Sequence, residues 1–231
     1  DDNFTTIVET VKDGRRIYDN IRKAVGYVFT IHIPIAFASL LAPMLGIAPT
    51  ALLLLPLHVV LLELIIDPTC SIVLERQPAE RDIMERGPRN PKEKLMTAKI
   101  LLKSILQGVV LFAASFGTYF AVLSQNPNDP PLARTMGLAI IVLSNLFLVQ
   151  VNSSDSDFAI QSFFRLIKDK VMWAVIIGTL AMLGVILYSP LNAFLKLAPL
   201  PAPMFFSAVG IAAVAVFWYE IVKLIKKLHK K

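Results

Sequence analysis

The sequence predicts an all-α fold, a polytopic membrane bundle of six transmembrane helices with both termini in the cytoplasm. First, 55% of the 231 residues are hydrophobic and only 17% are charged, and the mean hydropathy is +0.64. Soluble domains contain about 45–50% apolar and 25% charged residues. Second, the apolar residues form six long runs. Third, lysines and arginines concentrate in alternate connections between these runs. The composition therefore excludes an ordinary soluble enzyme.

Each run is long enough to cross a bilayer, which requires about 20 mostly apolar residues in a helix. The predicted transmembrane domain covers residues 24–222. Its six spans are residues 24–46, 50–74, 100–124, 133–151, 171–188 and 202–222. Residues 1–23 are too polar to insert, and no breaker separates them from the first span, so we expect a cytoplasmic stalk helix that continues into it. Residues 223–231 form a basic cytoplasmic tail.

The distribution of positive charge predicts the orientation. Of the 23 lysines and arginines, all but Arg134 and Lys196 lie in or next to the chain ends and the two long connections. Cations concentrate on the cytoplasmic side of membrane proteins, so both termini are expected there. The net charge of +6 therefore reflects topology, and we expect no nucleic-acid partner. The single cysteine, Cys70, excludes an internal disulfide and a cysteine-rich metal module.

The second span carries two carboxylates, and an ionisable group inside a membrane is costly and therefore a functional candidate. Glu63 and Asp67 are four residues apart, on one helix face. Pro68 has no N–H to donate, so we expect it to interrupt the helix and free a backbone carbonyl. Carboxylates and carbonyls are the ligands of hard cations. A structural hydrogen-bonded pair is disfavoured, because two buried carboxylates need a cation or a proton.

The first span repeats this arrangement with His32 and Pro34, which would free the carbonyl of Thr30. Because a short link joins the first two spans, their helices should pack as neighbours with their polar residues facing each other. Asn145, near the centre of the fourth span, is a further candidate ligand. His32 as a packing residue and Asn145 as a hydrogen bond between helices remain open alternatives. We interpret His58 as a packing residue.

Three stretches of the sequence carry a family resemblance. They are DDNFTTIVETVKDGRRIYDNIRK at 1–23, ELIID at 63–67 with PAERDIMERGPRNPKEKL at 78–95, and TMGLAIIVLSNLF at 135–147. Together they resemble the C-terminal half of P-type cation-transporting ATPases, in the calcium-pump-like branch. The resemblance covers essentially the whole chain. It implies that residues 1–23 correspond to the end of the phosphorylation domain and the stalk, and that the six spans correspond to family helices five to ten.

The resemblance implies that this chain contributes part of the membrane cation-binding site of an ATP-driven ion pump. The implied metal-site residues are Glu63, Asp67, His32 and Asn145, with Pro34 and Pro68 shaping the site. Asp67 matches the family's coordinating aspartate, and Asn145 matches a glutamate of the eighth helix.

This sequence departs from the calcium-pump pattern at three positions. Glu63 and His32 each stand where those pumps carry an asparagine, and Ile35 stands where they carry a glutamate. One carboxylate has thus moved from the fifth helix to the sixth. The transported ion therefore stays open between calcium, another divalent ion, a monovalent ion, and proton countertransport through His32, Glu63 and Asp67.

The resemblance also implies partners. The family's Asp-Lys-Thr-Gly phosphorylation motif, its Thr-Gly-Glu loop and its nucleotide-binding domain are not found in these 231 residues. We therefore expect no catalytic residue and no cofactor in this chain, which should not hydrolyse ATP alone. ATP and Mg²⁺ would act in an N-terminal catalytic half, covalent or separate, from which the chain looks cut. The lipid bilayer is the other partner, and a bacterial plasma membrane is the expected location of this multi-pass integral protein.

Two other functions compete with this interpretation. One is a stand-alone passive ion pathway or secondary transporter built from six helices, although no inverted repeat is evident in the sequence. The other is a truncated, non-transporting remnant or an accessory subunit. The first would support ion flux without ATP, and the second would show no cation affinity.

Overall fold

The computed structural model describes residues 4–80, 82–88, 93–154 and 169–228, and all regular secondary structure within these ranges is helical. The side chains of Asp67, Cys70, Ser71 and Lys226, and the last three residues of the predicted basic tail, lie outside this description. Within the described ranges, six helices are long and apolar enough to cross a membrane. The predicted fold class, a membrane bundle of six helices, is therefore confirmed.

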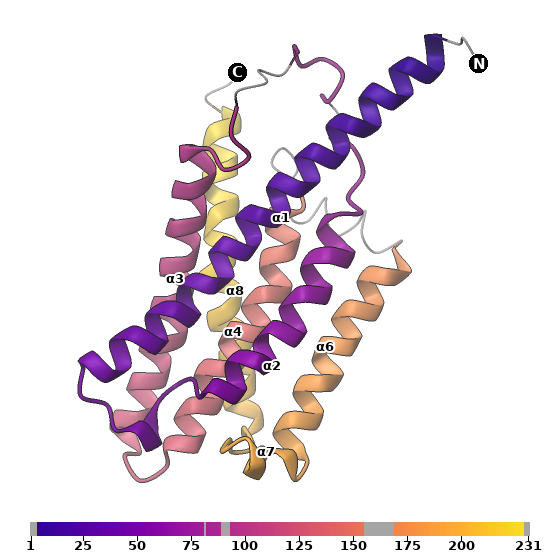
Figure 1. The fold of residues 1–231 in the computed structure, drawn as a ribbon. Helices are drawn as coiled ribbons and strands as arrows, with labels where there is room; N and C mark the ends of the chain where they lie inside the picture. The colour runs from indigo at the N-terminus through magenta and orange to yellow at the C-terminus, as the bar shows by residue number, and fades with distance from the viewer. Residues whose placement is uncertain (1–3, 81, 89–92, 155–168, 229–231) are drawn as a thin grey trace.

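The chain runs through its elements in the order in which Figure 1 colours them. These are α1 (Phe4–Met44), the 3₁₀ turn η1 (Pro49–Ala51), α2 (Pro56–Pro68), the π-helical turn η2 (Thr69–Leu74), α3 (Ala98–Gln125), α4 (Pro130–Asn152), α6 (Lys170–Tyr188), α7 (Leu191–Phe194) and α8 (Ala202–Leu228).

Helix α1 joins the predicted stalk and the first span in one continuous element of 41 residues, about 60 Å long at 1.5 Å per residue. Pro34 and Pro43 lie inside it without ending it. The N-terminal part of α1 projects beyond the bundle at the same end as the C-terminal end of α8, whereas η1 and α7 lie at the opposite end (Figure 1). The start of α1 and the end of α8 therefore lie on one side, as an even number of spans requires.

The second span is less regular than the sequence suggests, because its helix begins at Pro56 and not near Thr50. Pro56 cannot donate a backbone hydrogen bond, and its ring disfavours a helical Leu55, so the helix starts at the proline. At the other end, the sequence predicted a break at Pro68, but the helix does not break there. The chain continues from it as the π-helical turn η2, in which the Thr69 hydroxyl donates to the carbonyl of Ile65 at 2.9 Å.

Helix α4 forms the centre of the bundle. It packs against α3 and α8, and 89% of its most apolar stretch is buried, against 28–39% for the other five candidate spans. The remaining spans surround it, with α6 at one edge (Figure 1). A helix buried on all sides can carry polar groups that lipid would not tolerate, and α4 carries several.

Small residues bring α1 and α3 into close contact. The Ser104 hydroxyl donates to the carbonyl of Gly26 at 2.8 Å. Further along, a Cβ atom placed on Gly108 would lie 2.6 Å from Cβ of Ile33 and 2.7 Å from the carbonyl oxygen of Thr30. Small residues at such crossings let membrane helices approach closely. The contact at Gly108 involves the backbone of α1 and so cannot be relieved by a rotamer change.

Replacement of Gly108 by alanine should therefore separate α1 from α3 and destabilise the bundle by about 1–3 kcal/mol, the usual cost of overpacking. The thermal unfolding midpoint of the chain in detergent measures this effect. Gly117→Ala is the matched control, because Gly117 lies in the same helix with no atom within 4 Å of the added methyl group. Equal midpoints for the two variants would contradict the close packing at Gly108.

Candidate functional site

The structure brings His32 of α1 and Glu63 of α2 into direct contact. His32 Nε2 lies 3.0 Å from Glu63 Oε1. His32 Nδ1 lies 2.7 Å from the carbonyl oxygen of Val28. These two contacts hold the imidazole between the backbone of its own helix and the carboxylate of the next.

The contacts also define the protons that the pair holds. The Val28 carbonyl can only accept, so His32 Nδ1 carries a proton and donates it. The Nε2–Oε1 contact then needs one more proton, carried either by the imidazole or by the carboxyl group. The pair is therefore an ion pair or a neutral hydrogen-bonded pair. In both states a single proton lies between the two side chains.

The pair lies at the surface of this six-helix bundle. The side chains of His32 and Glu63 remain 43% and 37% exposed, although both residues belong to stretches apolar enough to span a membrane. Ionisable groups at such depth face a protein interior or a water-filled cavity and not lipid. On this principle the pair would face a further protein segment or a water-filled cavity.

Asp67 and Pro68 close helix α2 one turn beyond Glu63. The side chain of Asp67 lies outside the part of the chain that the structure describes, so its predicted role stays a prediction. The backbone spacing puts Asp67 on the same helix face as Glu63. The π-helical turn that follows is a type of irregularity that is common at functional sites.

Pro34 frees the carbonyl of Thr30, but that carbonyl turns toward α3. Its oxygen lies against Gly108, and the Thr30 hydroxyl donates to the carbonyl of Gly26 at 2.9 Å. The freed group thus lies at the contact between α1 and α3. Pro34 therefore leaves this carbonyl at the crossing of α1 and α3.

Asn145 is 1% exposed at the centre of α4. Within the described part of the chain, neither its side-chain oxygen nor its nitrogen has a hydrogen-bond partner, and the Oγ atom of Ser144 also has none. Buried amides are normally hydrogen-bonded, and each exception calls for an explanation such as a missing ion or water. No hydrogen bond among the described residues joins Asn145 to the His32–Glu63 pair. Likewise, no group of three or more His, Cys, Asp or Glu residues in the described ranges could hold a metal.

A cluster of hydrogen bonds to backbone carbonyls, here called the outer clasp, lies at the end of the bundle opposite the stalk. The buried guanidinium of Arg134 donates to the carbonyls of Leu52 at 2.8 Å, Thr50 at 2.7 Å and Lys196 at 2.5 Å. The Tyr119 hydroxyl donates to the carbonyl of Ala51. The clasp ties η1 and the segment after α7 to α3 and α4.

His58 strengthens the same end of the bundle. Its Nδ1 accepts a hydrogen bond from the backbone N–H of Leu55 at 3.2 Å, and its Nε2 donates to the carbonyl of Leu195 at 2.7 Å. This arrangement defines a neutral imidazole with its proton on Nε2. His58 caps the start of α2 and anchors the segment after α7, which agrees with a packing role.

At the stalk end of the bundle, the connection after η2 is fastened to the stalk. The buried amide of Asn20 donates to the carbonyls of Glu75 at 3.0 Å and Gln77 at 2.7 Å. Arg86 pairs with Asp82 at 2.7 Å and with Asp19 of α1 at 2.6 Å. The hydrogen bonds to Asp82 and then to Asp19 raise the pKa of Arg86 above its ordinary value. The guanidinium therefore remains charged throughout the physiological pH range.

A buried ion pair links the stalk and the connection after η2 to the end of α4. Lys23 Nζ of α1 lies 2.6 Å from Glu80 Oε1, and both side chains are about 95% buried, with 6% and 5% exposed. The Ser154 hydroxyl, just after α4, donates to the second oxygen of Glu80 at 2.9 Å. Sequence analysis did not select these groups, because a lysine and a glutamate far apart in the chain carry no sign of their pairing.

The family model "Cation transporting ATPase, C-terminus" matches residues 51–225. A calcium-transporting ATPase of Bacillus subtilis is 30% identical over 218 residues, covering 94% of this chain and 24% of that protein.

Two further relatives match over shorter stretches. A sodium/potassium-transporting ATPase subunit alpha-1 of Catostomus commersonii is 37% identical over 142 residues, covering 60% of this chain and 13% of that protein. A cation-transporting ATPase pma1 of Synechocystis is 30% identical over 159 residues, covering 68% and 17%. The chain thus spans about a quarter or less of the length of these relatives. It belongs to the P-type cation-transporting ATPase family, in which it represents the C-terminal membrane region.

Proposed function

We propose that the chain supplies part of the membrane cation site of an ATP-driven pump, with Glu63, Asp67, His32 and Asn145 as ligands or partners of the ion. The observation that carries this proposal is the contact between His32 and Glu63 at 3.0 Å, made by two neighbouring helices in an apolar bundle. One turn later come Asp67, Pro68 and the π-helical turn. The unpartnered amide of Asn145 adds an oxygen donor on the central helix.

The ligand types favour a hard cation. Carboxylate and amide oxygens suit calcium, which takes about six to eight oxygen ligands. The similarity to a calcium-transporting ATPase over 94% of the chain supports calcium as the first candidate. The sodium/potassium-transporting relatives make a monovalent ion the second candidate.

The exposure of His32 and Glu63 supports a covering partner. We infer that this partner is an N-terminal catalytic half, which brings further membrane helices and binds ATP and Mg²⁺. Covalent linkage is favoured, because the matching segment forms only 24% of the calcium-transporting relative. A bacterial plasma membrane is the proposed location, since that relative and the Synechocystis relative are bacterial proteins.

In this function α1 transmits movement. The helix runs without a break from the stalk to His32, and Asn20 and Arg86 fasten the connection after η2 to it. A displacement of the stalk by the catalytic half would therefore move both helices of the site together.

The test is cation-dependent phosphoenzyme formation by the chain assembled with its catalytic half in membranes. Radiolabelled ATP is supplied while calcium, manganese, sodium and potassium are varied separately. We expect calcium to stimulate phosphoenzyme formation saturably. Phosphoenzyme formation that is independent of every cation would contradict the proposal. Ion flux through vesicles containing this chain alone, without ATP, would instead support the passive pathway.

A further inference from the structure

A lysine from a neighbouring helix holds the stalk end of α4. The Lys223 ammonium of α8 donates to the carbonyls of Val151 at 2.6 Å and Ser154 at 2.9 Å. Val151 lies in the last turn of α4, which ends at Asn152, and Ser154 follows two residues later. The Lys223 side chain is only 6% exposed, so these hydrogen bonds form in the interior of the bundle.

This arrangement is a helix cap supplied from another helix. The last four carbonyls of an α-helix have no partner within the helix, and the helix dipole places negative charge at that end. The last turn of α4 contains no basic residue, so α4 does not supply its own cation there. Lys223 of α8 brings both the positive charge and the hydrogen-bond donors to this end.

The charge of Lys223 has a partner within α8. Its Nζ lies 3.0 Å from Oε1 of Glu220, one turn earlier in the same helix. The ion pair therefore belongs to α8, whereas the two hydrogen bonds join α8 to α4.

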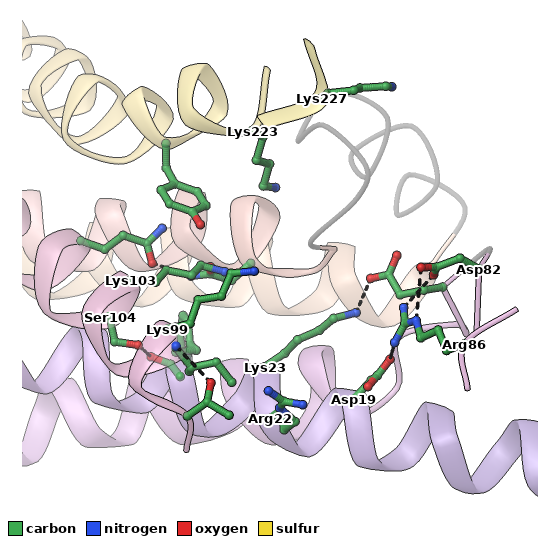
Figure 2. Close-up of a pocket in the computed structure, with 18 residues that line it drawn as sticks. Asp19, Arg22, Lys23, Asp82, Arg86, Lys99, Lys103, Ser104, Lys223 and Lys227 are labelled. Atoms are coloured by element: carbon green, nitrogen blue, oxygen red, sulfur yellow. Dashed lines mark hydrogen bonds and ion pairs between the residues drawn. The ribbon is translucent and has the colours of Figure 1, made fainter. Parts of the chain in front are cut away.

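A second lysine reaches the same segment from α1. Lys23 pairs with Glu80, whose other oxygen accepts a hydrogen bond from the Ser154 hydroxyl at 2.9 Å. Figure 2 shows Lys23 extending from α1 and Lys223 from α8, and both line a cavity of about 800 Å³ between α1, α3 and α8. Ser154 is thus bound to α1 through its hydroxyl and to α8 through its carbonyl.

Helix α8 contacts α4 again between this cap and Asn145. The rings of Phe147 and Phe217 lie 5.4 Å apart, measured between their centres. Together with the cap, this contact holds α4 in register with α8 at two levels along the bundle.

The cap acts on Asn145 because α4 is regular between the two. The segment from Asn145 to Asn152 is helical throughout and contains no proline or glycine, so an axial displacement of its end moves the whole segment. Val151 is six residues beyond Asn145, or about 9 Å along the axis. Among the described residues, neither polar atom of the Asn145 amide has a hydrogen-bond partner. The depth of Asn145 in the bundle therefore follows the helix that carries it.

We propose that Lys223 is a positioning residue for the cation site. By capping α4, it sets the depth at which the Asn145 amide meets the ion, although the lysine is not itself a ligand. The inference rests on the proposed role of Asn145 as a ligand. Groups that only orient a metal ligand still change metal affinity, typically by about 10–100-fold.

The test is a double-mutant cycle between Lys223 and Asn145, made in the chain assembled with its catalytic half in membranes. The measurement is the cation concentration that gives half-maximal phosphoenzyme, for whichever of calcium, manganese, sodium and potassium stimulates the unmodified protein. Lys223→Met keeps much of the side-chain volume but removes the charge and the donors. It should raise the half-maximal concentration at least about fivefold, less than the loss of a group that touches a ligand. In an Asn145→Ala background the same change should have an effect below about 1.5-fold, because coupled residues are not additive.

Two further variants separate this role from general charge and from folding. Lys99→Met removes the same charge from an exposed position at the start of α3 and should shift the half-maximal concentration by less than about 1.5-fold. Lys223→Arg keeps the charge and the donors on a longer side chain, which displaces the end of α4 without releasing it. This variant should raise the half-maximal concentration about twofold, and it carries the test if Lys223→Met does not insert.

The outcomes distinguish the inference from the function on which it rests. Unchanged cation affinity in the inserted Lys223 variants would overturn the inference, and so would an equal shift in both backgrounds. A lower thermal unfolding midpoint in detergent with unchanged affinity would likewise reduce the cap to a structural contact. Unchanged affinity in Asn145→Ala alone would remove Asn145 from the site, and the inference would fail together with the proposed role of that residue.

Discussion

Glu63→Gln is expected to lower the apparent cation affinity of the assembled pump by at least about tenfold, which corresponds to 1.4 kcal/mol. The amide can still hydrogen-bond to His32 Nε2, now 3.0 Å from the carboxylate, so the local geometry should survive. The change removes one negative charge from the site, and ligand charge is a main determinant of cation affinity. The measurement is the cation concentration that gives half-maximal phosphoenzyme.

Two companion variants give this prediction its controls. Glu85→Gln removes an exposed carboxylate from the connection after η2 and should leave the cation dependence unchanged. His32→Asn introduces the asparagine that, by the resemblance, calcium pumps carry at this position. This variant should retain cation-dependent phosphorylation. Unchanged cation affinity in a correctly inserted Glu63→Gln variant would remove Glu63 from the site.

Arg134→Met is expected to cause the largest loss of stability, about 3 kcal/mol or more. The guanidinium donates to three carbonyls from two separate segments, and a hydrogen bond to a charged group contributes about 1.5–3 kcal/mol. Methionine fills a similar volume but leaves all three acceptors without their donor. The thermal unfolding midpoint in detergent should fall well below that of the unmodified chain.

Lys196→Gln is the matched control, because Lys196 is the other cation on the outer side and its side chain is exposed. Its carbonyl accepts from Arg134 and is kept in the variant. Arg134→Lys should be intermediate in stability, since a single ammonium cannot reproduce the planar fork of a guanidinium. A midpoint for Arg134→Met within the range of the Lys196 control would mean that the outer clasp does not hold the bundle together.

The fold could be predicted from the sequence because its determinants are local. Apolar runs of sufficient length specify spans, and lysines and arginines specify orientation. The structure departs from the predicted helix bounds at prolines, whose effect depends on the residues around them. Pro56 delays the start of α2, and Pro68 shifts the helix to the π form without breaking it. The outcome at a proline depends on which nearby hydroxyls and carbonyls are available, and one such group is Thr69.

The candidate site could be predicted in part. Ionisable residues in apolar runs selected His32 and Glu63, and the short link between their helices indicated that they could meet. The direction of the Thr30 carbonyl could not be predicted, because it depends on the crossing of α1 with Gly108 of α3. Residues far apart in the sequence form the cavity, the Lys23–Glu80 pair and the outer clasp, and periodicity carries no information about such pairings.

The outer clasp has a consequence for how this end of the molecule can vary. Arg134 recognises Thr50, Leu52 and Lys196 only through their peptide oxygens, and a peptide oxygen is present whichever side chain the residue carries. Substitutions at these three positions should therefore be tolerated as long as the backbone path is kept. These hydrogen bonds therefore leave the side chains of Thr50, Leu52 and Lys196 free to vary, whereas the arginine that makes them is not.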